Sequence, residues 1–186
     1  MNTSTLSLAL VSLFAALVAV FGLIPKIDLP LGVPITMQTL GVMLAGCLLG
    51  PKRGLQALLL FLAAVALGLP LLSGGRGGLA PFFAPASGYL IAWPLGAFVA
   101  GWVMSFMPTE TPRQSAIAAF VASAVGGLLV VHVCGVIGLV NIANLSWEQA
   151  IFGTLVFVPG DLIKCALTAT VVHTVARGLP DWQLGR

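Results

Sequence analysis

Long apolar runs, separated by short polar or proline-rich connections, make up almost the whole chain. A run of about 20 apolar residues is the length of helix that crosses the hydrocarbon core of a bilayer. Six runs approach this length and predict six transmembrane helices, at residues 6–24, 35–49, 54–69, 89–107, 115–140 and 159–176. The segment 146–158 is too short to cross alone and predicts a short interfacial helix. We therefore expect an all-α integral membrane protein with a single membrane domain, residues 1–186.

Composition and charge agree with this pattern. The chain has 186 residues, of which 59% are hydrophobic and 7% charged, whereas a soluble domain carries about a quarter charged residues. Cytoplasmic loops hold more Lys and Arg than outer loops, so we expect both termini in the cytoplasm of a protein in the cell membrane. The few scattered basic residues do not indicate nucleic-acid binding. With this orientation the inner side holds Lys52, Arg53, Arg113, Arg177 and Arg186, and the outer side holds Lys26 and Arg76.

The stretch VPGDLIK, residues 158–164, places two charges, Asp161 and Lys164, in an otherwise apolar run. A charge inside a membrane helix costs roughly 2.5–3.5 kcal/mol on insertion scales, so such residues usually face the bundle interior and pair or bind something. Pro159 suits the first turn of a helix, where the helix dipole favours the negative charge of Asp161. Lys164 follows on the same face. The pair either holds a polar ligand or is an ion pair that only locks helices together.

Other polar and aromatic residues are weaker candidates. The connection 70–88 is too rich in Gly and Pro for a regular helix yet is apolar, so we expect it to fold back over the membrane-embedded part. Its Arg76, within the GGRGG motif, is either a cation for a ligand or a turn residue that pairs with a lipid headgroup or Asp28.

We interpret His132 as hydrogen-bonded to a neighbouring helix rather than as a proton carrier. Three tryptophans are interpreted as membrane-interface anchors, namely Trp93, Trp102 and Trp147.

Together these stretches resemble the BioY family, the biotin-specific substrate-binding subunits of energy-coupling factor (ECF) vitamin importers. The resemblance covers essentially the whole chain, and its segments follow the order and spacing of the family. It implies six helices, both termini in the cytoplasm, and a biotin cavity beneath two loops, between helices one and two and between helices three and four. Five segments carry it: IPKIDLP (24–30), GVPITMQTLGVMLAG (32–46), GLPLLSGGRGGL (68–79), SGYLIAWPLGAF (87–98) and PGDLIK (159–164).

Biotin, as the ligand that the resemblance implies, suits the residues already singled out. Its ureido ring offers two N–H donors and one carbonyl acceptor, and its valerate tail ends in a carboxylate. Asp161 can accept the ureido N–H bonds, Lys164 can donate to the ureido oxygen or to the tail, and Arg76 can clamp the carboxylate. Gln38 and Tyr89 are further expected contacts. Which cation meets which end of biotin stays open.

The resemblance also implies protein partners. These are a transmembrane coupling subunit and two ATP-hydrolysing subunits, docked against helices one to three, where Ala15 and Ala19 match a small-residue motif of the family. Small side chains four residues apart allow close helix packing in lipid. The chain has no nucleotide-binding motif of its own, so ATP dependence has to come from partners. Transport without that module and a homodimer both remain open.

Other functions were weighed against biotin binding. One alternative keeps the transporter subunit and changes the ligand to another vitamin. A second is an intramembrane enzyme that uses Asp161 as general base, which needs a nucleophile or metal cluster; Ser73 and Ser87 have no adjacent histidine, and the three cysteines lack metal-ligand spacing. A third is a lipid-facing scaffold. We expect a biotin-binding membrane subunit that is not an enzyme and needs no metal or cofactor.

Overall fold

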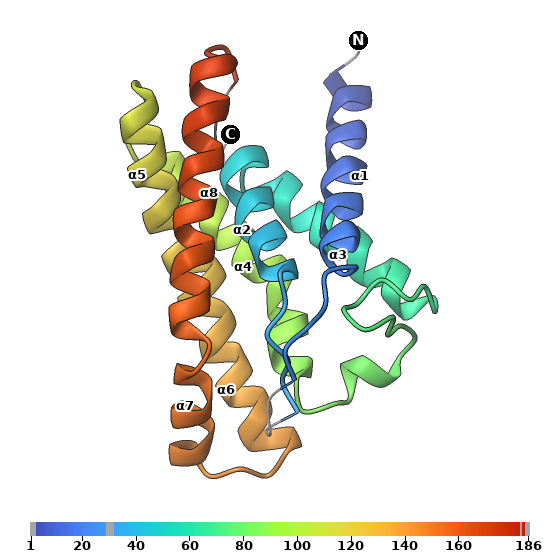
Figure 1. The fold of residues 1–186 in the computed structure, drawn as a ribbon. Coiled ribbons are helices and arrows are strands. Elements are labelled where there is room, and N and C mark those ends of the chain that lie inside the picture. The colour runs from blue at the N-terminus through green and yellow to red at the C-terminus, as the bar shows by residue number, and fades with distance from the viewer. Residues whose placement is uncertain (1–2, 29–31, 183, 185–186) are drawn as a thin grey trace.

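The structure, a computed structural model, describes residues 3–28, 32–182 and 184 and is all-helical over them, as the apolar runs predict. In the described residues there is no strand, and two isolated β-bridges join Ile27 to Ile35 and Leu72 to Arg76. The helices, including the 3₁₀-helix η1 and the π-helix η2, follow in the order shown in Figure 1: α1 (Thr3–Phe21), α2 (Gln38–Leu49), α3 (Pro51–Ala66), η1 (Ala80–Phe82), α4 (Ser87–Phe106), α5 (Pro112–Ala122), η2 (Ser123–Val130), α6 (Val131–Ile142), α7 (Trp147–Leu155) and α8 (Val158–Gly178).

The observed helices follow the predicted spans closely. Each of the six predicted ranges matches a helix or a continuous helical run, with bounds that differ by no more than three residues at either end. Within the described part of the chain, α4 and the run Pro112–Ile142 are long and apolar enough to cross a membrane, and α7 with α8 forms a third candidate bent by 48°. The apolar helices α1 and α2 are shorter. Six crossings therefore stay a prediction.

The predicted fifth span is one continuous run of 31 residues made of α5, η2 and α6. It starts at a capping box, in which the hydroxyl of Thr111 accepts from the backbone N–H of Gln114 at 3.2 Å. Pro112 occupies the first turn, where its missing N–H has no intrahelical partner. The π-helix in the middle widens the turns just before His132; π-helices are rare and are frequent at functional sites.

Helix α4 lies at the centre of the bundle and packs against α2, α3, α5, η2 and α6. Small residues let these helices approach closely. A methyl group added at Gly46 of α2 would lie 2.5 Å from the carbonyl oxygen of Ala97, and one added at Gly126 of η2 would lie 2.4 Å from that of Gly96. The backbones of α2 and η2 therefore touch the backbone of α4 directly.

The two ends of the bundle differ in character. The start of α1 and the last turns of α8 lie at one end, whereas residues 22–28 and 32–37 between α1 and α2 and the helix α7 lie at the other, as Figure 1 shows. The bend between α7 and α8 puts the VPGDLIK stretch just inside the end that carries α7. Asp161 lies in the first turn of α8 with Pro159 before it, as predicted.

Candidate ligand-binding site

A cavity of about 80 Å³ lies between residues 33–36 of the loop before α2, the loop 67–86 and the ends of α2, α4, α6 and α8. One water molecule needs roughly 10–15 Å³, so the cavity has room for more than a single water. Its wall is mostly apolar with a few polar side chains, as is typical of small-molecule sites. The polar and titratable residues on the wall are Thr36, Gln38, Thr39, Arg76, Tyr89, His132, Asp161 and Lys164.

The carboxylate of Asp161 is the centre of a polar cluster that joins three helices. Its Oδ1 accepts a hydrogen bond from Nζ of Lys164 at 2.8 Å, and its Oδ2 lies 2.8 Å from Nε2 of His132 on α6. Lys164 also donates to the hydroxyl of Thr39 on α2, at 2.8 Å. The ion pair expected within α8 therefore forms, and it also links α8 to α2 and α6.

This cluster is buried. Asp161 and Lys164 are each 5% exposed and His132 is 8% exposed. A buried ion pair is weak evidence for stability, because the cost of removing both charges from water offsets most of their attraction. Its position on a cavity wall, with hydrogen-bonding capacity left over, is what a site for a polar ligand requires.

Aromatic side chains form the apolar part of the wall. Tyr89 packs against Phe157 with ring centroids 5.8 Å apart and lies edge-on to His132 at 6.2 Å. The hydroxyl of Thr154 donates to the carbonyl of Ala150 at 2.7 Å, so it accepts the proton of the Tyr89 hydroxyl, 2.6 Å away. Tyr89 can then offer a ligand its ring and an acceptor oxygen.

The prediction that Trp93 is a membrane-interface anchor is wrong. Trp93 is 6% exposed, packs against Phe61 at a centroid distance of 5.9 Å and lines the cavity. The central position of α4 explains this, because Trp93 lies on a face of the helix that packs against other helices. Trp102 and Trp147 are more than half exposed, as an anchor requires.

Gln38 lines the cavity, but its amide is occupied by the protein itself. Its Nε2 donates to the carbonyls of Val18 and Leu71, both at 3.1 Å, and its Oε1 accepts from the backbone N–H of Ser73 at 3.1 Å. This 1% exposed side chain thus joins α1, α2 and the loop 67–86. These bonds favour a role in shaping the wall, and a ligand contact by Gln38 stays a prediction.

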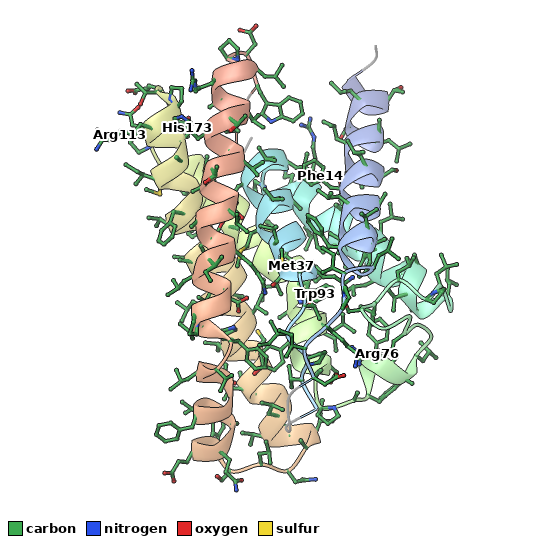
Figure 2. The ribbon with its side chains drawn as sticks, in the orientation of Figure 1. Phe14, Met37, Arg76, Trp93, Arg113 and His173 are labelled. Atoms are coloured by element: carbon green, nitrogen blue, oxygen red, sulfur yellow. The ribbon has the colours of Figure 1, made fainter. Side chains whose placement is uncertain are left out.

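Arg76 lies on the loop side of the cavity, half-buried (Figure 2). Its Nε donates to the carbonyl of Ser73 at 3.2 Å, within the turn closed by the bridge between Leu72 and Arg76. The alternative partner Asp28 instead forms an ion pair with Lys26. The end of the guanidinium group can therefore meet a ligand, and this role stays a prediction.

The two loops are tied to each other above the cavity. The hydroxyl of Ser73 lies 3.3 Å from the carbonyl oxygen of Gly22 and 3.1 Å from that of Ile24. The stem of Lys26 lies against Gly74, where an added methyl group would come within 2.8 Å of Cε of Lys26. The loop 67–86 therefore folds back over the helices as expected, although Leu79 and Phe83 in it are exposed.

The two alanines predicted to contact a partner subunit lie on α1. Ala15 is 8% exposed and belongs to the hydrophobic core, and Ala19 packs against that core from a partly buried position. Ala16, between them, is exposed. The inward position of Ala15 does not favour a partner contact there, and the interface stays a prediction.

Sequence reasoning did not place His132 and Thr39 in the site. The interpretation of His132 as hydrogen-bonded to a neighbouring helix agrees with the structure, but its partner is the candidate ligand residue Asp161, 29 positions away. Thr39 bonds a residue 125 positions away. The available signal was that Thr36, Gln38 and Thr39 interrupt the apolar pattern of the second run, which indicated a start facing protein or water.

Comparisons with known proteins find relatives that match nearly the whole chain. The BioY family matches residues 1–181. A protein of Rhizobium etli named biotin transporter BioY is 42% identical over 180 residues, which cover 95% of this chain and 96% of that protein. A protein of the same name from Rhodobacter capsulatus is 42% identical over 189 residues, which cover 97% of this chain and 98% of that protein.

A solved structure is also similar over nearly the whole length. It is the crystal structure of the S-component for biotin from an ECF-type ABC transporter, with a TM-score of 0.82 and 32% sequence identity. The match covers 95% of this chain and 94% of that one. With its multi-pass helical fold and the matching segments, this chain belongs to the BioY family.

Proposed function

We propose that the protein is the biotin-binding subunit of a membrane transporter and mediates biotin uptake across the cytoplasmic membrane. One observation carries the proposal: Asp161 and Lys164 form a buried pair on the wall of a cavity whose surface is mostly apolar. Intramembrane ionisable residues in such positions commonly mark substrate sites. Relatives named biotin transporters, similar over nearly their whole length, support biotin as the ligand.

The chemistry of biotin fits the two parts of the cavity wall. Asp161 can accept the ureido N–H groups, and Lys164 can donate to the ureido oxygen. The rings of Tyr89, Trp93 and Phe157 offer apolar surface for the thiophane ring and the aliphatic chain. Arg76, on the loop side, is then the cation for the valerate carboxylate, since a guanidinium group matches carboxylate geometry.

We propose that partner subunits drive the transport. The similar S-component comes from an ECF-type ABC transporter, which supports ECF partners in general. In the finer form proposed here, these are one transmembrane coupling subunit and two ATP-hydrolysing subunits, while a homodimer is the alternative assembly. The chain itself is a single membrane domain of six spans with both termini in the cytoplasm.

The family and its named relatives support a transporter subunit over an enzyme. The contacts of Asp161 agree with this reading. Its neighbours are an ammonium group, an imidazole and a threonine hydroxyl that already accepts from Lys164. A general base would face the atom that it deprotonates, whereas both oxygens of Asp161 are engaged in holding the helices and, as proposed, the ligand.

Isothermal titration of the biotin-free protein in detergent with biotin tests the proposal. We expect the wild type to bind tightly, and Asp161→Asn and Lys164→Ala to bind about 100-fold more weakly or worse, since truncating one partner of a buried charge pair typically costs 2–5 kcal/mol or more in binding. Asp181→Asn, the same change at an exposed position near the carboxyl end, serves as control and should bind as the wild type.

The outcomes separate the alternatives. A wild type that gives no heat with biotin, and from which no biotin is released on denaturation, would refute the biotin site. A heat of binding measured on titration with another vitamin, such as thiamine or riboflavin, would then identify a transporter subunit of different specificity. Tight biotin binding that survives both substitutions would leave Asp161 and Lys164 as a helix lock.

A further inference from the structure

We infer that His132 is a positioning residue of the ligand site, which fixes the carboxylate of Asp161 in the orientation that receives the ligand. This inference rests on the proposed biotin site. His132 lies in α6, directly after the π-helix η2, and its buried side chain reaches the cavity wall. It comes from a different helix than the Asp161–Lys164 pair.

Donors hold the carboxylate of Asp161 on both of its oxygens. Nζ of Lys164 is 2.8 Å from Oδ1, and Nε2 of His132 is 2.8 Å from Oδ2. An ionised carboxylate only accepts and has about four lone-pair sites, so Nε2 carries the hydrogen. The hydroxyl of Thr39 also donates to Oδ1, at 3.5 Å, so Oδ2 is the oxygen that keeps a site for a further donor. Because these donors arrive from different helices, the carboxylate cannot rotate, and its remaining acceptor site points in a fixed direction.

The imidazole that provides one of these donors is itself held in place. Tyr89 and Phe157 both pack edge-on against it, with ring centroids 6.2 Å away and interplanar angles of 74° and 65°. Tyr89 is in turn tied to Thr154 of α7 by a 2.6 Å hydrogen bond. A donor fixed by packing in this way is pre-organised, and pre-organisation lowers the cost of binding.

An uncharged donor is what this position requires. The buried cluster contains one carboxylate, Asp161, and one ammonium group, Lys164, so their charges balance. A second permanent cation here would leave an uncompensated buried charge, which is costly. A neutral imidazole holds Oδ2 without changing that balance, and an amide of similar reach can do the same.

Biotin titrations of three variants test the inference. His132→Phe keeps a ring and removes the donor, and we expect its affinity to fall about 10- to 100-fold, the range for loss of a hydrogen bond to a charged group. His132→Gln carries an amide N–H near the position of Nε2 and should recover most of the affinity. His132→Asn, whose amide is one methylene shorter, should bind as weakly as the Phe variant.

The control is His173→Phe, the same change at the other histidine of the chain. That side chain contacts the carbonyl of Pro112 at the opposite end of the bundle, and the substitution should be neutral for binding (Figure 2).

If His132→Phe does not fold, the Gln and Asn variants still decide the question by comparison. Wild-type affinity in His132→Phe, or equal weakness in the Gln and Asn variants, would overturn the inference. A wild type that binds no biotin would refute the biotin site itself, and the inference with it.

Discussion

At the scale of single residues, Gln38 is the side chain whose structural role is easiest to test. Its amide bonds two carbonyls and one N–H that belong to two other segments, α1 and the loop 67–86. Gln38→Leu removes the bonds to the Leu71 carbonyl and the Ser73 N–H, whereas the Val18 carbonyl keeps its bond from the N–H of Gly22. We expect the unfolding free energy to fall by about 1–3 kcal/mol. Thermal unfolding in detergent, without ligand, measures the effect. Gln56→Leu, at an exposed position of α3, is the matched control; equal midpoints for the two variants would show that the Gln38 amide is not a structural tie.

The residues of the site differ in how far the sequence predicts them. Asp161 and Lys164 were predictable because a charge in an apolar run is costly and therefore conspicuous. His132 and Thr39 were not, because their bonds to Asp161 and Lys164 depend on how three helices pack, and spacing along the chain does not reveal that. Neighbours at i and i+3 follow from helix geometry, whereas partners on other helices do not.

At the scale of elements, the packing of the π-helix η2 leads us to expect different stability costs for alanine at its two adjacent glycines, Gly126 and Gly127. A methyl group on Gly126 would lie 2.4 Å from backbone atoms of both Gly96 and Ala100, so α4 has to move. For one on Gly127 the three nearest atoms all belong to the side chain of Met43, the first at 2.4 Å, and methionine side chains adapt readily. We expect Gly126→Ala to cost about 1–3 kcal/mol, the usual range for overpacking, and Gly127→Ala to cost less.

Thermal unfolding of the two glycine variants measures this difference. Each variant serves as the control for the other, because the change is the same and helix propensity rises equally in both. A Gly127→Ala protein that is the less stable of the two would contradict the close contact between η2 and α4.

Helix positions were predictable from the sequence where physical signals mark them. Apolar runs gave the lengths, and a proline occupies the first turn of α3, α5 and α8, where it is tolerated. The π-helix has no such signal, since the apolar run continues unchanged through Ser123–Val130. Its wide turns accompany the close packing of Gly126 on α4, which is a tertiary contact.

At the scale of the whole molecule, the cavity lies at the end of the bundle opposite to the start of α1 and the last turns of α8. The cavity is lined by residues 33–36 before α2, the loop 67–86 and the start of α8, beside α7. Arg113 and His173 lie at the other end (Figure 2). If the basic residues set the orientation as they commonly do, the cavity faces the outside of the cell, as uptake of a scarce external vitamin requires.

Cysteine labelling in intact cells tests that orientation. Glu148→Cys, exposed on α7, should react with a membrane-impermeant maleimide from outside, whereas Arg113→Cys, exposed at the start of α5, should react only after the membrane is permeabilised. The native chain is the background control, because Cys47 and Cys165 are buried and Cys134 is partly buried. The reverse labelling pattern would place the cavity on the cytoplasmic side. Asp161 and Lys164 could then receive biotin only from inside the cell, a geometry that suits export and not uptake.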